Sequence, residues 1–236
     1  MADRPPDHSP GRRPIRSYVL REGRLTAGQR RALDQLWPRY GLTLPPAGEA
    51  PDYRRAFGRD APLHLEIGFG DGGALLEMAG NNPHCNFLGA EVHRPGVGRL
   101  LLQIEARQLA NIRLFCEDGM GVLTTAVAER ALAAVYLYFP DPWPKKRHHK
   151  RRIMQPAFNE LAATRLAAGG HFHFATDWQD YAEQALERLE QCGQLENCAG
   201  RGCFSPRPAW RPQTKFERRG QRLGHRVRDI VMRKAR

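Results

Sequence analysis

The chain has 236 residues, enough for one domain with an extension, and 41% of them are hydrophobic, which is enough for a packed core. No apolar run approaches the ~20 residues needed to span a membrane, and the first residues, MADRPPDHSPGRRPIRSY, lack the apolar segment of a secretory signal. These features favour a cytoplasmic protein. The net charge of +12 favours a polyanionic partner, either nucleic acid or an anionic membrane surface.

The five cysteines do not form a pattern typical of a disulfide framework or a metal site. Their number is odd, no pair is separated by two residues, and the chain is not small. A zinc site built from Cys192, Cys198 and Cys203 would need closer spacing and a fourth ligand. We therefore expect free thiols in a reducing compartment and no bound metal.

Residues 1–53 are predicted to form a basic, flexible arm that contains one amphipathic helix, over residues 27–37. Pro38 ends this helix, because proline cannot continue a helix interior. Residues 54–236 are predicted to form a single domain, because short apolar runs then alternate regularly with amphipathic ones.

Strands and helices are predicted to alternate along this domain. The predicted strands cover residues 63–67, 86–92, 112–116, 133–139 and 171–176, and the predicted helices cover residues 73–80, 98–110, 121–131, 156–168 and 178–191. This alternation predicts an α/β fold with a parallel, doubly wound sheet. In such sheets ligands bind at the carboxyl ends of the strands. The residues at these ends are a glycine turn at 68–72, then Glu91, Asp118, Asp141 and Asp177.

The turn sequence EIGFGDGG is compatible with two classes of ligand. Gly68, Gly70 and Gly73 fit the dinucleotide fingerprint, and Gly68, Gly70 and Gly72 fit the turn seen in enzymes that use S-adenosylmethionine. Glycine turns of this kind also occur for purely structural reasons, so the motif alone is a weak signal.

The charges around the turn favour S-adenosylmethionine. Glu66 and Asp71 would repel a pyrophosphate, whereas they suit the cationic sulfonium and ammonium groups of S-adenosylmethionine. Glu91 is placed to accept hydrogen bonds from ribose hydroxyls, and Asp118 to contact the edge of adenine. Each acid alone could equally be a helix cap or a surface charge, but their shared position at strand ends predicts a methyltransferase. An NAD-dependent oxidoreductase and a non-catalytic RNA-binding module are the alternatives.

The stretch VYLYFPDPWPKKRHHKRR, residues 135–152, places an acid, an indole and a block of positive charge after one strand. A basic run is usually a solvated surface, but beside a predicted active site it could hold a nucleic-acid backbone over the reacting groups. Trp143 either stacks on a base or packs within the loop.

Several motifs in order closely resemble the bacterial tRNA (guanine-N7)-methyltransferases. They are LEIGFG, GAEVHRPGVG, the YFPDPWPKKRHHKRR block, HFATDWQDY and TKFERRGQRLGH, and together they cover roughly residues 63 to the C-terminus. One local departure from the family is Asp71, where an uncharged residue is expected. The resemblance implies that the chain binds tRNA and transfers the methyl group of S-adenosylmethionine to N7 of a guanosine in the variable loop, at position 46. Another RNA substrate is the nearest alternative.

The resemblance also implies roles for individual residues. Asp141 would be the catalytic carboxylate; the cofactor-binding residues would be Glu66, Gly68, Gly70, Glu91, Asp118 and Asp141; the substrate-binding residues would be Lys145, Asp177, Thr214, Lys215, Phe216 and Glu217; and the RNA-contacting residues would be Arg147, His148, His149, Lys150, Arg151 and Arg152. The implied fold for residues 54–236 is a seven-stranded, mostly parallel methyltransferase sheet whose C-terminal segment forms an antiparallel hairpin. Because guanine N7 already carries a lone pair, the implied reaction needs alignment and electrostatic stabilisation but no general base.

Overall fold

The computed structural model describes residues 17–18, 23–46, 49 and 51–235, and for Lys215, Phe216, Arg219 and Gln221 it describes the backbone only. The strands are β1 (Gly41–Leu42), β2 (Leu63–Ile67), β3 (Asn86–Ala90), β4 (Ile112–Phe115), β5 (Leu132–Tyr138), β6 (Leu166–Thr176), β7 (Leu195–Asn197) and β8 (Arg228–Lys234). The helices are α1 (Ala27–Gln35), α2 (Trp37–Tyr40), α3 (Tyr53–Phe57), α4 (Gly73–Asn81), α5 (Arg94–Ala106), α6 (Gly119–Gly121), α7 (Pro156–Arg165), α8 (Gln179–Glu190) and α9 (Lys215–Arg222), with a π-helix η1 (Val122–Ala126) and a 3-10 helix η2 (Lys146–Arg151).

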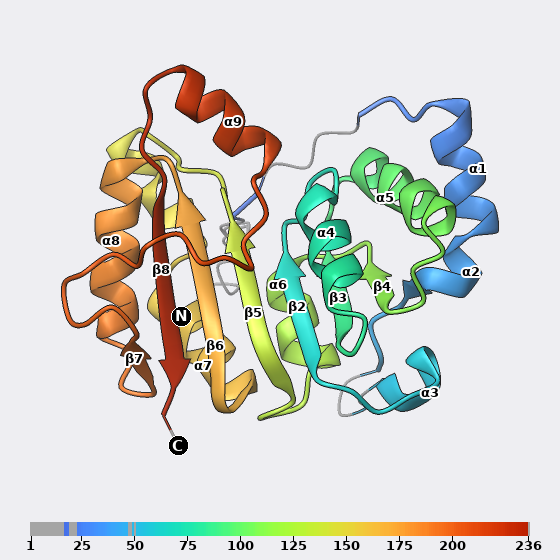
Figure 1. Ribbon diagram of the computed structural model, residues 1–236, viewed down its shortest axis with the longest axis horizontal. Coiled ribbons are helices and arrows are strands. Elements are labelled where there is room, and N and C mark those ends of the chain that lie inside the picture. Colours follow the sequence, from blue (N-terminus) through green and yellow to red (C-terminus); the bar gives the residue numbers. More distant parts are fainter. Residues whose placement is uncertain (1–16, 19–22, 47–48, 50, 236) are drawn as a thin grey trace, which may run out of the picture.

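The strands form one sheet in the order β1-β4-β3-β2-β5-β6-β8-β7, shown edge to edge in Figure 1. The pairs from β1 to β6 are parallel, whereas β8 runs antiparallel to both β6 and β7. The predicted fold class is therefore confirmed, including the antiparallel C-terminal strands. The strand beyond the predicted seven is β1, which adds two residues to the edge beside β4.

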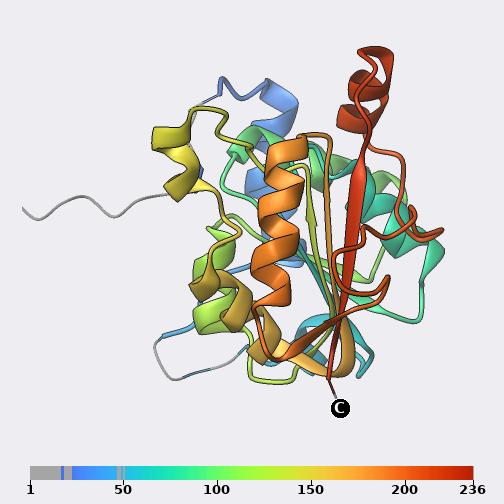
Figure 2. The ribbon, with the colours of Figure 1, turned by 90° about the vertical axis from the view of Figure 1, so that its left-hand side faces the viewer.

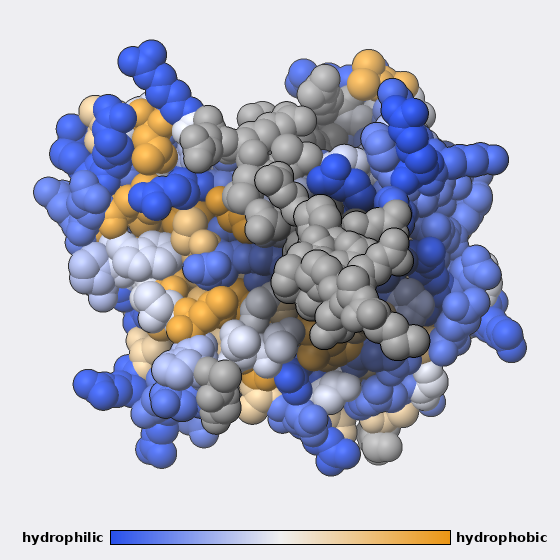
Figure 3. Space-filling model, turned by 180° about the vertical axis from the view of Figure 1, so that it is seen from behind, coloured by the Kyte–Doolittle hydropathy of each residue, from blue (hydrophilic) through white to orange (hydrophobic). Residues whose placement is uncertain are grey.

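Helices cover the sheet from both sides, as Figures 1 and 2 show. Alternate residues of β5 divide between two apolar cores: Val135 and Leu137 pack in the core that includes residues of α7 and α8, and Tyr136 and Tyr138 pack with α4 and α5. On the face opposite to that of Figure 1, the visible apolar surface is broken into patches among hydrophilic side chains (Figure 3). Among the described helices, none is both long and apolar enough to cross a membrane.

The first described elements of the chain join the body of the molecule. The predicted helix over residues 27–37 is observed as α1, which ends before Pro38, and α1 packs against α5. β1 then pairs with β4. The division of the chain at residue 53 and the flexibility of residues 1–53 stay predictions, and residues 1–16 lie outside the described part.

Several element boundaries differ from the sequence prediction, among them the following three. Helix α5 starts at Arg94 rather than at residue 98, because Pro95 suits the first helical turn and Gly96 allows a close contact described below. The predicted helix over residues 121–131 ends at Ala126, the last residue of η1. Strand β6 starts at Leu166 rather than at residue 171, and its register against β5 shifts within this added part, which contains a glycine pair.

Candidate active site

A cavity of about 740 Å³ lies at the carboxyl ends of β2, β3, β4 and β5. We call it the acidic cavity, because Glu66, Glu91, Asp118 and Asp141 all line it. The C-terminal segment contributes Gln213, Thr214 and Arg218 to its wall. The structure thus brings together every predicted cofactor-binding residue, with Gly68 and Gly70 in the turn between them.

The glycine turn has a backbone that only glycine adopts easily. Gly68, Gly70 and Gly72 have φ angles of 70°, 60° and 78°. A Cβ atom at Gly96, in the first turn of α5, would lie 2.1 Å from the carbonyl oxygen of Gly70. Gly96 therefore allows α5 to press against the turn and fix its position.

Glu91 ties the turn to the end of β3. Its carboxylate accepts hydrogen bonds from the backbone N–H of Gly70 at 2.8 Å and of His93 at 2.9 Å. Each carboxylate oxygen still has a lone pair for a further donor. Glu91 is therefore oriented by the backbone and can accept from the hydroxyl groups of a ligand.

Glu66 is a buried acid that lacks a counter-charge within the described residues. It is 3% exposed, and Oε2 has no hydrogen-bond partner there. Burial, followed by the nearby carboxylates of Glu91 and Asp71, raises the pKa of Glu66 to about 8. A cationic group in the cavity would relieve this cost, which fits the sulfonium and ammonium groups of S-adenosylmethionine and opposes a pyrophosphate.

Asp141 lies in a loop of unusual backbone conformation that follows β5. Phe139 and Trp143, two residues to either side of Asp141, have φ angles of 50° and 46°, which non-glycine residues rarely adopt. The carboxylate of Asp141 is exposed and faces the cavity. Conformations of this kind concentrate at functional sites, where the surrounding structure holds them in place.

The indole of Trp143 packs against other groups of the protein. The guanidinium of Arg151 lies 3.8 Å from the centroid of the indole ring, and the indole N–H donates to the carbonyl of Ser17 at 3.1 Å. His148 approaches the ring edge-on at 6.0 Å between ring centroids. These contacts favour the packing interpretation over stacking on a base.

The predicted substrate-binding residues do not all reach the cavity. Thr214 lines it, but Lys145 and Asp177 do not, and Asp177 pairs with His225 at 3.2 Å. Glu217 is 2% exposed and forms two hydrogen bonds with the guanidinium of Arg211, at 2.6 and 3.0 Å. The side chains of Lys215 and Phe216 lie outside the described part of the structure.

The basic segment, residues 145–152, is not uniform. The side chains of Arg147 and Lys150 are exposed, and those of His148, His149 and Arg151 are half-buried. Arg152 is 1% exposed, and its guanidinium contacts protein groups. The surface of this segment therefore suits a polyanion, but in this conformation Arg152 does not reach that surface.

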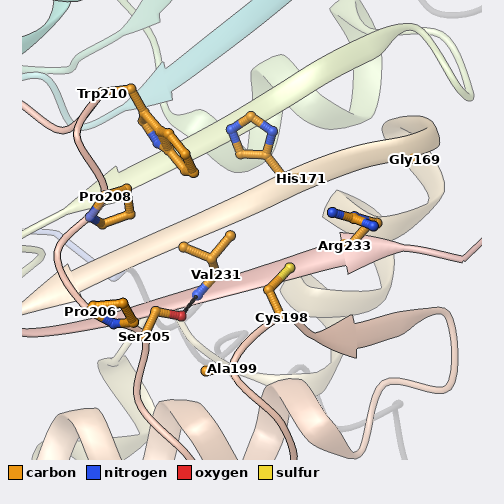
Figure 4. A pocket seen from close by; sticks show the side chains of 10 residues that line it. All are labelled: Gly169, His171, Cys198, Ala199, Ser205, Pro206, Pro208, Trp210, Val231 and Arg233. Atoms are coloured by element: carbon orange, nitrogen blue, oxygen red, sulfur yellow. Dashed lines mark hydrogen bonds between the residues drawn. The ribbon is translucent and has the colours of Figure 1, made fainter.

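A second cavity, of about 410 Å³, lies over β6 and β8 under the loop that carries Trp210 (Figure 4). Its lining is mainly apolar and contains no carboxylate. Burial lowers the pKa of His171, one of its lining residues, to about 4. The acidic cavity is therefore the candidate active site.

Sequence reasoning missed some residues of the acidic cavity. Phe139 and Arg218 line it, as do Glu117 and Arg99. Phe139 ends an apolar strand and looked like core, and Arg218 looked like one cation among many. The available signal was position: Phe139 directly precedes the loop of Asp141, and Arg218 follows Thr214 by one helical turn.

Solved structures share the fold at low sequence identity. The structure resembles the 16S rRNA methyltransferase KamB with a TM-score of 0.57 and 13% identity, over 80% of this chain and 95% of that one. It resembles the aminoglycoside resistance methyltransferase NpmB1 with a TM-score of 0.54 and 11% identity, over 79% and 95%. These likenesses support the fold.

Sequence relatives are much closer. Residues 60–230 match a family model described as a putative methyltransferase. The chain is 56% identical over 232 residues, 98% of each chain, to a tRNA (guanine-N(7)-)-methyltransferase of Alkalilimnicola ehrlichii, and 55% identical over 235 residues, 100% of each chain, to one of Methylococcus capsulatus. The similarity therefore extends beyond the residues on which the sequence analysis relied. The chain belongs to the bacterial tRNA (guanine-N(7)-)-methyltransferase family.

Proposed function

We propose that this chain transfers the methyl group of S-adenosylmethionine to N7 of a guanosine in tRNA, and that the guanosine is the one at position 46 of the variable loop. The observation that carries the proposal is the identity above 50% over nearly the whole chain with relatives named for this reaction. The acidic cavity supports it, because its uncompensated carboxylates suit a cationic methyl donor. We also infer that the protein acts in the cytoplasm, where tRNA is found.

The residues of the acidic cavity fit S-adenosylmethionine. Glu66 would face its positive charge, Glu91 would accept from its ribose hydroxyls, and Asp118 would contact the edge of its adenine. When bound, S-adenosylmethionine supplies a methyl group on a positively charged sulfur that is open to nucleophilic attack. The orphaned oxygen of Glu66 is the structural observation that this assignment explains.

The chain has to orient the guanine and stabilise the charge that it gains. N7 attacks with its own lone pair, so no side chain has to remove a proton beforehand. Methylation leaves positive charge on the purine ring, and Asp141, which is exposed and lines the cavity, would stabilise that charge. Asp141 is therefore the proposed catalytic residue.

The tRNA would approach over the basic segment and α9. We propose that Arg147 and Lys150 contact its phosphates and that Thr214 contacts the guanosine. Asp177 would reach the guanosine after releasing His225.

A direct assay tests the function. Purified protein is incubated with methyl-labelled S-adenosylmethionine and tRNA that lacks N7-methylguanosine, and the tRNA is then cleaved chemically at N7-methylguanosine. We expect label in the tRNA and cleavage at position 46. Cleavage at another position would contradict the proposed target, and label on protein or no label in tRNA would contradict the function.

A further inference from the structure

We propose that Arg152 is a positioning residue that holds Asp141 in place, and that it does not contact RNA. The inference rests on the proposed function, in which Asp141 lies beside the reacting purine. Arg152 directly follows η2, which is the short yellow helix beside the upper end of α8 in Figure 2. Its sequence context suggests an RNA contact, but its side chain is fully buried.

The guanidinium of Arg152 joins two parts of the chain. Its Nε donates to the carbonyl oxygen of Pro142, the residue after Asp141, at 2.8 Å. Its Nη1 and Nη2 donate to Gln184 at 3.0 Å and to Asp180 at 2.5 Å, both on α8. The guanidinium also lies 4.8 Å from the ring centroid of Tyr181. A planar group with five donors in fixed directions can satisfy these three acceptors at once, whereas a lysine ammonium on a flexible stem cannot.

The loop of residues 139–144 has few backbone donors with which to stabilise its own conformation. Pro140, Pro142 and Pro144 have no backbone N–H to donate. Phe139 and Trp143 carry positive φ angles, which persist only where contacts from outside the loop fix them. The bond from Arg152 to the carbonyl of Pro142 is such a contact, and it acts at the residue next to the proposed catalytic carboxylate.

The three hydrogen bonds of Arg152 form a clamp between the loop of Asp141 and α8. The α8 end of this clamp lies near the end of a second strand, β6. Asp180 lies three residues after Asp177, on the helix that follows β6. By joining Asp180 and Gln184 to Pro142, Arg152 sets the spacing between the ends of β5 and β6. Ile153, the next residue, lines the acidic cavity.

The substitution Arg152→Lys separates a positioning role from an RNA contact, because it keeps the positive charge and removes the fixed geometry. We expect the single-turnover rate of methyl transfer, at saturating tRNA and S-adenosylmethionine, to fall about 100-fold, as for a small misplacement of reacting groups. The tRNA Kd and its salt dependence should stay within about twofold of wild type, because the buried side chain of Arg152 makes no phosphate contact that could be lost. A normal single-turnover rate, or a weaker Kd with a normal rate, would overturn the proposal.

Two further variants separate positioning from general stability. Arg165→Lys is the matched control: Arg165 is a half-buried arginine, distant in the chain from this loop, whose Nε donates to the carbonyl of Leu123 at 2.8 Å. It should lower Tm and leave the single-turnover rate within about twofold of wild type. Asp180→Ala, at a carboxylate whose side chain is 62% exposed, removes one end of the clamp without emptying the core. It should lower the rate about tenfold even if Arg152→Lys fails to fold, and an unchanged rate would overturn the proposal.

Hydrogen exchange tests the clamp independently of the activity. The amides of Phe139, Asp141, Trp143 and Lys145 should exchange faster in Arg152→Lys, or in Asp180→Ala if the former fails to fold, than in wild type. Unchanged exchange would overturn the positioning role. If the wild-type protein transfers no methyl group to tRNA, the proposed function fails, whereas this measurement still decides whether Arg152 holds the loop.

Discussion

Glu66 in the acidic cavity and Glu217 in the first turn of α9 are buried to nearly the same degree, 3% and 2% exposed, yet their surroundings differ completely. Glu217 forms two hydrogen bonds with Arg211, which also donates to Asp229 at 3.1 Å. Glu66 has an oxygen without a partner in the described structure and a pKa raised to about 8, chiefly by burial. A buried charge beside its counter-ion is compensated within the fold and is costly to break, whereas a buried acid without one is a candidate site for a cation.

Glu217 belongs to a network of four side chains that we call the α9 anchor: Arg211, Glu217, Asp229 and His173. His173 Nε2 lies 2.8 Å from Asp229 Oδ1, and Nδ1 lies 3.1 Å from the hydroxyl of Tyr138. The anchor joins β5, β6 and β8 to the first turn of α9, and so places Thr214 and Arg218 at the cavity. Glu217, which the family resemblance predicts to bind substrate, contributes to that placement in this structure.

The largest effect is expected from Arg211→Leu, which removes the buried guanidinium that pairs with both Glu217 and Asp229. Breaking a buried pair by removing one partner costs about 3–5 kcal/mol in the free energy of unfolding, measurable by urea denaturation. Arg207→Leu is the matched control, because Arg207 lies 3.7 Å from the carboxylate of Glu217 but has a side chain that is 48% exposed. Arg207→Leu should lower the free energy of unfolding by less than about 1 kcal/mol. Equal losses of unfolding free energy in Arg211→Leu and Arg207→Leu would contradict the distinction between buried and exposed partners.

A change at Asp141 should act on the reaction and leave the fold intact, the opposite of Arg211→Leu. We expect Asp141→Ala to lower the single-turnover rate at least about thousandfold, equivalent to ~4 kcal/mol of transition-state stabilisation. Glu183→Gln, at an exposed carboxylate of α8, is the control and should keep the wild-type rate. Wild-type turnover by Asp141→Ala would remove Asp141 from the catalytic role.

Glu66→Gln tests, through the pH dependence of stability, whether Glu66 is buried without a counter-charge. Because the folded pKa of Glu66, about 8, lies above the unfolded value of 4.5, the folded state holds an extra proton between these values, so the wild type loses stability as pH rises through this window. Relative to Glu66→Gln, the loss should reach about 3 kcal/mol by pH 7. Calorimetry at pH 7 should also show proton release when S-adenosylmethionine binds the wild type, and none in the variant.

Asp71→Asn is the companion variant, because Asp71 is one of the two carboxylates that raise the pKa of Glu66. Removing its charge should lower that pKa, so the loss of stability, which still begins near pH 4.5, should end at a lower pH and be smaller in total. A stability difference between wild type and Glu66→Gln that does not change with pH would show that Glu66 is not buried as an uncompensated acid.

The sequence predicted the acidic cavity better than it predicted the α9 anchor. Glu66, Glu91, Asp118 and Asp141 were predictable because the ends of parallel strands meet at one edge, so that alternation alone brings these positions together. Arg152 and Arg211 were not, because burial of an arginine depends on acceptors elsewhere in the chain. Asp180 is 28 residues from Arg152, and Asp229 is 18 residues from Arg211. A run of cations looks the same in sequence whether its members face water or the core.

The smallest effect, finally, is expected where the charge is neither buried nor in the cavity. Replacing Arg147 and Lys150 by alanine together should weaken tRNA binding and reduce the slope of log K against log salt by about 1 for each phosphate that is no longer neutralised. The matched control is Arg54→Ala with Arg55→Ala, which removes the same charge from α3, at the end of the sheet opposite to α9 in Figure 1. Equal changes of slope in the two double variants would mean that tRNA senses only the net charge. A change confined to Arg147 and Lys150, with an unaltered affinity for S-adenosylmethionine, would mean that the exposed part of the basic segment holds tRNA over the cavity whose wall Arg152 supports.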